Sequence, residues 1–205
     1  MRYPYIAFDI DGTLTNSEYA CIRSLQDTLE SLTGVAPAQE ELAFSLGIPG
    51  VDTLKILGIP DIPSAFQLWE NNLKKYWDTV TLFPGIPELL EELTRRGCRL
   101  GVVTSQTRAE YEEGFAPLPI ARHFTTLVRA DDAPEHKPSP VPLLKFMDLA
   151  GCEPSELLFI GDREGDLRCA RGAGVDFALA GWGNPDKLMD CTYRLEKPED
   201  LLRYL

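Results

Sequence analysis

The sequence lacks the cysteine patterns that build disulfide frameworks and zinc sites. It has five cysteines among 205 residues, and no two of them stand at C-x-x-C spacing. An odd number of scattered cysteines argues against a disulfide scaffold or a zinc knuckle. Reduced thiols in a cytoplasmic protein are the simpler interpretation.

Long apolar runs and an excess of basic residues are also missing. The opening MRYPYIAFDIDGTL holds a short apolar run that ends in two acids, unlike a signal peptide. No stretch approaches the roughly 18 apolar residues of a membrane span. Acidic residues outnumber basic ones by 32 to 20, a net charge of −12, whereas nucleic acid and anionic membranes bind basic surfaces. We expect a soluble protein that binds neither nucleic acid nor membrane, and nothing in the sequence indicates its oligomeric state.

Short apolar runs alternate with helical patterns along most of the chain. The runs do not alternate polar and apolar residues, which is typical of parallel strands covered on both faces. The predicted strands are Tyr5–Phe8, Leu100–Val103, Thr125–Val128, Leu157–Ile160 and Phe177–Ala180. The predicted helices are Pro87–Arg96, Arg108–Glu113, Val141–Leu149 and Asp166–Arg171. This order predicts an α/β fold, a doubly wound parallel sheet of Rossmann type.

The interval 17–80 differs from the rest, because it holds helical patterns such as Ile22–Leu32 and Ala65–Trp77 and no convincing strand. We expect a small helical cap at 17–80, inserted after the first strand into an α/β core formed by 1–16 and 81–205. Ordinary crossover helices are the alternative, although a crossover rarely needs about 60 residues.

Acidic residues follow two of the predicted strands. Asp9 and Asp11 come directly after the first strand, and Gly12 allows a tight turn there. Asp162 and Asp166 follow the strand Leu157–Ile160. Ligands bind at the carboxyl ends of parallel strands, and clustered carboxylates need a cation to offset their repulsion. The four acids therefore predict an oxygen-rich site suited to Mg2+.

Hydroxyl groups and a lysine are expected at the same edge. Thr104 and Ser105 end the strand Leu100–Val103, where hydroxyl and backbone N–H groups suit an anion. Lys137 lies in a proline-stiffened loop, His-Lys-Pro-Ser-Pro, just before a helix. These groups would neutralise a phosphate locally in an otherwise acidic protein.

The ordered segments DxDGTL, Thr-Ser, Lys and GDxxxD together resemble the haloacid dehalogenase superfamily of aspartyl-phosphate enzymes. The wider context, with LFPGIPELLEEL and KPSP, resembles the phosphoglycolate phosphatase branch. The resemblance implies that Asp9 is the nucleophile and Asp11 the general acid/base. It also implies Mg2+ ligands from Asp9, the Asp11 backbone carbonyl, Asp162 and Asp166, the last directly or through water. Thr104, Ser105, Gly12 and Lys137 would hold the phosphoryl group.

Weaker expectations concern substrate selection. Gly47 and Ile48 resemble the cap loop that faces the active site in this branch, although Gly-x-Pro is also an ordinary turn. Arg108 is a candidate anion contact, with a helix-surface arginine as the alternative. Gln106 stands where the branch often carries lysine, so the resemblance gives no cationic substrate contact there.

The predicted function is Mg2+-dependent hydrolysis of a small phosphorylated metabolite, with phosphoglycolate as the first candidate by resemblance. A phosphomutase of the hexose-phosphate type is the nearest alternative, because it uses the same chemistry. A non-catalytic protein that binds a phosphometabolite is the third, although binding alone would not require Asp11.

Overall fold

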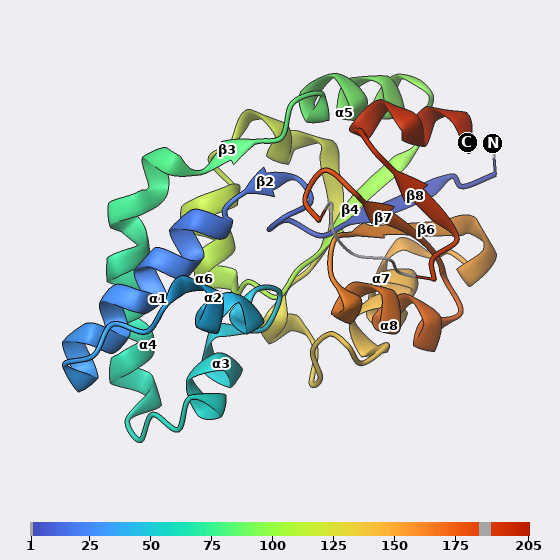
Figure 1. Ribbon diagram of the computed structural model, residues 1–205. Coiled ribbons are helices and arrows are strands. Elements are labelled where there is room, and N and C mark those ends of the chain that lie inside the picture. Colours follow the sequence, from blue (N-terminus) through green and yellow to red (C-terminus); the bar gives the residue numbers. More distant parts are fainter. Residues whose placement is uncertain (1, 185–189) are drawn as a thin grey trace. The chain divides into compact units, whose positions relative to one another are not determined.

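The chain forms two compact units in the computed structural model, which describes residues 2–184 and 190–205. The larger unit combines the chain up to Thr15 with Leu82–Leu205, and the inserted unit is Asn16–Thr81 (Figure 1). The two connecting segments, β2 (Thr15–Asn16) and β3 (Thr81–Leu82), pair as a short two-stranded sheet.

The larger unit is built on a six-stranded parallel sheet in the order β5-β4-β1-β6-β7-β8. Its strands are β1 (Tyr5–Phe8), β4 (Arg99–Val103), β5 (Phe124–Val128), β6 (Leu157–Gly161), β7 (Asp176–Ala180) and β8 (Tyr193–Leu195). All five predicted strands are present, and the predicted doubly wound α/β fold is confirmed. The edge strand β8 is an addition that the sequence did not predict.

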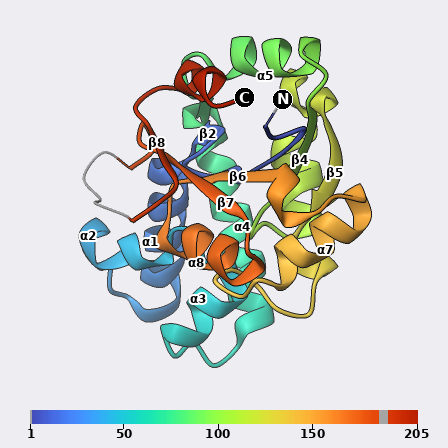
Figure 2. The ribbon, with the colours of Figure 1, turned by 90° about the vertical axis from the view of Figure 1, so that its right-hand side faces the viewer.

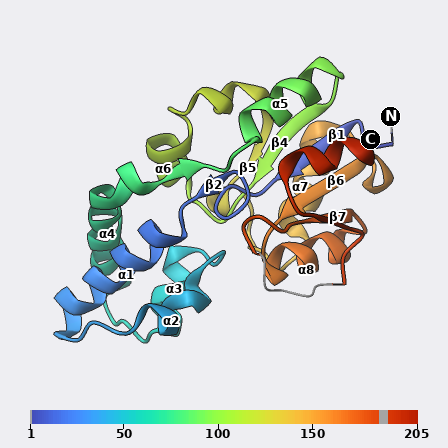
Figure 3. The ribbon, with the colours of Figure 1, turned by 45° about the horizontal axis from the view of Figure 1, so that its top comes forward.

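Both faces of this sheet are covered, which explains the non-alternating strands. In β1, Ile6 and Phe8 join one apolar cluster while Ala7 joins the other, and all three are fully buried. Helix α5 (Ile86–Arg95) packs in the first cluster. Helices α7 (Val141–Ala150) and α8 (Glu164–Ala173) pack in the second, on the other side of the sheet (Figures 2 and 3).

The register of β4, β1 and β6 determines which residues lie side by side where these strands end. Phe8 at the end of β1 lies opposite Val102 of β4 and Ile160 of β6. The residues that follow these strands therefore leave the same edge of the sheet at nearly the same height.

The helix after β4 is shorter than the predicted Arg108–Glu113. Helix α6 covers Arg108–Glu110 only, and a π-helical turn continues it over Tyr111–Phe115. The wider turn leaves both Tyr111 and Phe115 buried in the first apolar cluster, so burial of two aromatic rings overrides the regular helical pattern.

The inserted unit contains only helices besides the connecting strands. They are α1 (Glu18–Thr33), α2 (Gln39–Leu42), α3 (Gly50–Ile56) and α4 (Ile62–Leu73), with 3-10 turns at Ala43–Ser45 and Lys74–Thr79. Helix α4 starts earlier than the predicted Ala65 because the Asp61 carboxylate accepts a hydrogen bond from Ser64 N at 3.2 Å and caps it. Within the described ranges, no helix is both long and apolar enough to cross a membrane.

Candidate active site

The loop after β1 is a tight turn that depends on glycine. Asp9 N extends the sheet by donating a hydrogen bond to Ile160 O at 2.8 Å. Leu14 N and Thr15 N both donate to Ile10 O and so close the turn. Gly12 has a φ of +83°, and a Cβ atom there would lie 2.3 Å from Asp162 Oδ2. Only glycine therefore allows the loop to pass this close to Asp162.

Two carboxylates that directly follow β1 and β6 meet a third from α8 at this edge of the sheet. Carboxylate oxygens of Asp9, Asp162 and Asp166 all lie within 4.8 Å of one another. The three residues are almost completely buried. Asp9 and Asp162, which are 153 positions apart in the chain, thus lie together with Asp166, at the sheet edge where the sequence predicted an acidic site.

Lys137 supplies the main positive charge of the cluster. Its Nζ lies 2.9 Å from Asp9 Oδ1 and 2.7 Å from Asp166 Oδ1, and its side chain is buried. Burial alone would lower the pKa of Lys137, but the charges of Asp166 and Asp9 outweigh it and raise the pKa. The lysine is therefore an ammonium group held between the two carboxylates.

With all three carboxylates ionised, the cluster would carry more negative charge than Lys137 and Arg163 offset. Burial raises the pKa of Asp9 and of Asp162, with Asp166 adding to both, although Lys137 opposes the shift. Arg163 offsets part of the charge because its Nε lies 2.8 Å from Asp162 Oδ2. Three buried oxygen donors with excess negative charge fit a small hard divalent cation such as Mg2+.

Thr104 and Ser105 follow β4 beside β1. Thr104 N donates to Val128 O at 3.0 Å, and Thr104 Oγ1 accepts a hydrogen bond from Gln106 N at 3.2 Å. The Thr104 side chain is buried and Ser105 is half-buried. Since its oxygen already accepts from Gln106, the Thr104 hydroxyl can donate its proton to an anion at this edge.

Asp11 is not part of the three-carboxylate cluster. Its Oδ2 instead accepts a hydrogen bond from Gln106 Nε2 at 2.8 Å. Its carboxyl group is therefore distinct from the three clustered carboxylates, and the resemblance assigns only its backbone carbonyl to the metal.

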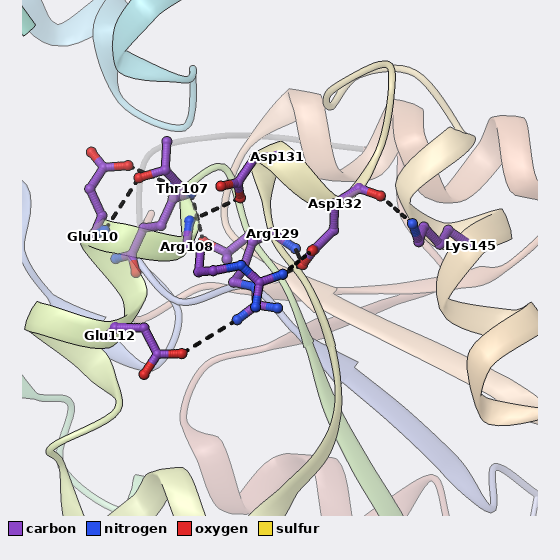
Figure 4. Close-up of polar contacts among 10 residues, drawn as sticks. Thr107, Arg108, Glu110, Glu112, Arg129, Asp131, Asp132 and Lys145 are labelled. Atoms are coloured by element: carbon purple, nitrogen blue, oxygen red, sulfur yellow. Dashed lines mark hydrogen bonds and ion pairs between the residues drawn. The ribbon is translucent and has the colours of Figure 1, made fainter.

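The remaining predicted residues are Arg108 on the core and Gly47 and Ile48 in the inserted unit. The Arg108 guanidinium lies 2.8 Å from Asp132 Oδ1, in a network of charged residues between the loops after β4 and β5 (Figure 4). Gly47 and Ile48 belong to the inserted unit, where Ile48 N donates to Ser45 O at 3.2 Å. These three residues keep their substrate-binding role as a prediction.

The loop after β7 contributes contacts that the sequence analysis missed. Trp182 Nε1 donates to Thr13 O at 2.9 Å, and Asn184 Nδ2 donates to Asp162 O at 2.5 Å. A Cβ atom on Gly183 would lie 1.7 Å from Gly12 O. The signal was present, because Gly-Trp-Gly-Asn directly follows a predicted strand at the same sheet edge.

Comparisons with known proteins match most of the chain. Residues 6–180 match the family model for haloacid dehalogenase-like hydrolases. Pyrophosphatase PpaX of Bacillus velezensis is 29% identical over 98% of this chain and 95% of its own length. PpaX of Oceanobacillus iheyensis is 29% identical over 96% and 94%.

Among solved structures, a Lactobacillus plantarum protein assigned as a phosphoglycolate phosphatase is 34% identical. It superposes with a TM-score of 0.90 and covers 100% of both chains. The similarity therefore spans the inserted helices as well as the sheet.

Proposed function

Because the chain belongs to the haloacid dehalogenase-like hydrolases and is a phosphatase of that family, we propose that it hydrolyses a small phosphate monoester with Mg2+ through a phosphorylated Asp9. The observation that carries the proposal is the buried Lys137 ammonium, 2.9 Å from Asp9 and 2.7 Å from Asp166, beside the Asp162 carboxylate. Membership of a hydrolase family argues against a non-catalytic binding protein.

In the first half of the proposed reaction, an Asp9 carboxylate oxygen attacks phosphorus and the bond to the leaving oxygen breaks. Asp11 gives that oxygen a proton, so the product leaves as an alcohol. Lys137 and the Thr104 and Ser105 hydroxyl groups hold the phosphoryl oxygens, and Gly12 lets the loop approach them. Charge stabilisation and positioning are the main sources of rate in phosphoryl transfer.

In the second half, a water molecule attacks phosphorus and the bond to Asp9 breaks. Asp11, now a carboxylate, takes the proton of that water, and free Asp9 and phosphate result. Asp9, Asp162, the Asp11 backbone carbonyl and Asp166, directly or through water, would hold Mg2+. The bound ion would supply positive charge to the phosphoryl oxygens.

We assign the larger unit, up to Thr15 and Leu82–Leu205, as the core and the inserted unit, Asn16–Thr81, as a cap that selects the substrate. The bounds expected from the sequence, 1–16 and 81–205 for the core and 17–80 for the cap, differ from these by one residue at each junction. Gly47 and Ile48 are its candidate substrate contacts, and Arg108 is a candidate on the core. The first substrate candidate is phosphoglycolate. Pyrophosphate, a phosphoanhydride rather than a monoester, is a second candidate, favoured by the PpaX relatives that match nearly the whole chain.

The test is phosphate release from 2-phosphoglycolate, pyrophosphate and glucose 1-phosphate, each with Mg2+ and with a chelator. We expect Mg2+-dependent phosphate release from 2-phosphoglycolate or pyrophosphate. Conversion of glucose 1-phosphate to the 6-phosphate without free phosphate would show a mutase instead. Turnover that persists in chelator would contradict the role of the metal.

A further inference from the structure

The Gln106 side chain has one hydrogen-bond partner within residues 2–184 and 190–205, and that partner is Asp11. Its Nε2 donates to Asp11 Oδ2 at 2.8 Å. Its Oε1 is buried and accepts no hydrogen bond from the described residues. A buried amide oxygen without a partner costs free energy, so a purely structural amide would be expected to satisfy both ends.

The backbone of Gln106 is fixed on both sides. Its carbonyl accepts from Ala130 N at 2.8 Å, and its N–H donates to Thr104 Oγ1 at 3.2 Å. The first bond ties the loop after β4 to the loop after β5, and the second ties it to a buried residue at the end of β4.

A network of charged residues braces the same two loops. Arg108 N donates to Asp131 Oδ1 at 2.9 Å, and the Arg108 guanidinium lies 2.8 Å from Asp132 Oδ1 (Figure 4). Asp132 Oδ2 lies 2.7 Å from Arg129 Nε within the loop after β5. Arg129 is itself buried, so this end of the network is shielded from solvent. The amide of Gln106 therefore projects from a rigid base rather than from a mobile loop.

We propose that Gln106 is a positioning residue for Asp11, holding the carboxyl group at the place where it exchanges a proton with the leaving oxygen. The proposal rests on the function proposed above. Without the amide N–H, the half-buried Asp11 side chain loses a bond that restricts its rotation. A displacement of about 1 Å in a reacting group can lower the rate up to about a hundredfold.

The test compares Gln106→Met with the wild-type protein in the hydrolysis of two esters. Methionine is nearly isosteric with glutamine but cannot donate a hydrogen bond to Asp11. The leaving group of 2-phosphoglycolate is an alkoxide that needs a proton. The leaving group of 4-nitrophenyl phosphate is a phenolate that departs without one. The value of kcat/KM reports the steps up to departure of this group and excludes the later attack by water. We expect kcat/KM to fall by about tenfold to a hundredfold for 2-phosphoglycolate and by less than about threefold for 4-nitrophenyl phosphate.

A double-mutant cycle tests whether the effect passes through Asp11. In an Asp11→Asn background, Gln106→Met should change kcat/KM for either ester by less than about twofold, because the group it positions is already inactive. Gln67→Met, at an exposed position of the inserted unit, is the matched control and should leave both values unchanged. Thermal melting of each variant confirms that it is folded.

The outcomes separate the two proposals. Two results would overturn the role of Gln106 while leaving the proposed phosphatase function intact. One is an equal loss of kcat/KM for both esters in Gln106→Met. The other is a loss of kcat/KM in the Asp11→Asn background as large as the loss in the wild-type background. An Asp11→Asn protein that keeps wild-type kcat/KM for 2-phosphoglycolate would refute Asp11 as the acid. A wild-type protein that releases phosphate from neither ester would overturn the proposed hydrolysis of phosphate monoesters, and the role of Gln106 with it.

Discussion

Gly12 illustrates how a single missing side chain lets two loops approach each other. Replacing it with alanine should combine two costs, the positive φ of +83° and a Cβ atom 2.3 Å from Asp162 Oδ2. We expect Gly12→Ala to lower the free energy of unfolding by more than about 2 kcal/mol and to abolish turnover, because Asp162 must move. Chemical denaturation and a phosphate-release assay measure the two effects.

Gly97 offers a matched control, since its φ is +84° and a Cβ atom there would meet nothing within 4 Å. Gly97→Ala should cost about 1 kcal/mol from the backbone conformation alone and leave turnover unchanged. Equal stability losses in the two variants would show that the approach to Asp162 is unimportant.

Asp9→Asn should remove the proposed nucleophile with little change in shape. An amide cannot form the acyl phosphate, so we expect kcat to fall at least about a thousandfold. The fold should persist, because the change removes one negative charge from three buried carboxylates around Lys137. Circular dichroism and single-turnover assays check both parts, and phosphatase activity near the wild-type level would refute Asp9 as nucleophile.

At the scale of elements, neighbouring residues on α7 should respond very differently to the same truncation. Leu143 is fully buried in the second apolar cluster, whereas Leu144 is 47% exposed. Leu143→Ala should lower the free energy of unfolding by about 2–5 kcal/mol and Leu144→Ala by about 0.5 kcal/mol or less. Urea denaturation of both variants measures the difference, and similar losses would contradict the packing of α7 against the sheet.

The strands were predictable because their chemistry is local. Runs of four apolar residues, bounded by proline, glycine or acidic residues, define β1 and β6 to within a residue at each end. The short edge strand β8 was not predictable, since Tyr193–Leu195 has an arginine at its centre and pairs with one neighbour only. Its place depends on β7, which lies elsewhere in the sequence.

The site was predictable as far as strand ends determine it. Asp9 and Asp162 follow neighbouring strands, so a parallel sheet brings them together without further information. The bond between Gln106 and Asp11 could not be predicted, because it depends on side-chain conformations in two loops 95 residues apart. Asn184 follows a predicted strand at the same edge, so its place near the site was predictable, but the bond from its amide to Asp162 O was not.

For the whole molecule, charge is the dominant feature. The chain carries a net charge of −12, and three of its acids are buried together in one cluster. A divalent cation that binds only the folded chain would stabilise it by mass action, by about 2.7 kcal/mol at a hundredfold excess over Kd. We therefore expect Mg2+ to raise the melting temperature above its value in chelator by roughly 5–10 °C.

Part of any such increase could come from screening of the general negative charge, and two variants separate the contributions. Asp148→Asn removes an exposed acid from α7, so it should keep the Mg2+-dependent increase. Asp162→Asn replaces a buried carboxylate with a neutral amide and should lose most of the increase, because the two remaining carboxylates are already paired with Lys137. Differential scanning calorimetry at constant ionic strength gives both values, and an undiminished increase in Asp162→Asn would place the ion outside this cluster.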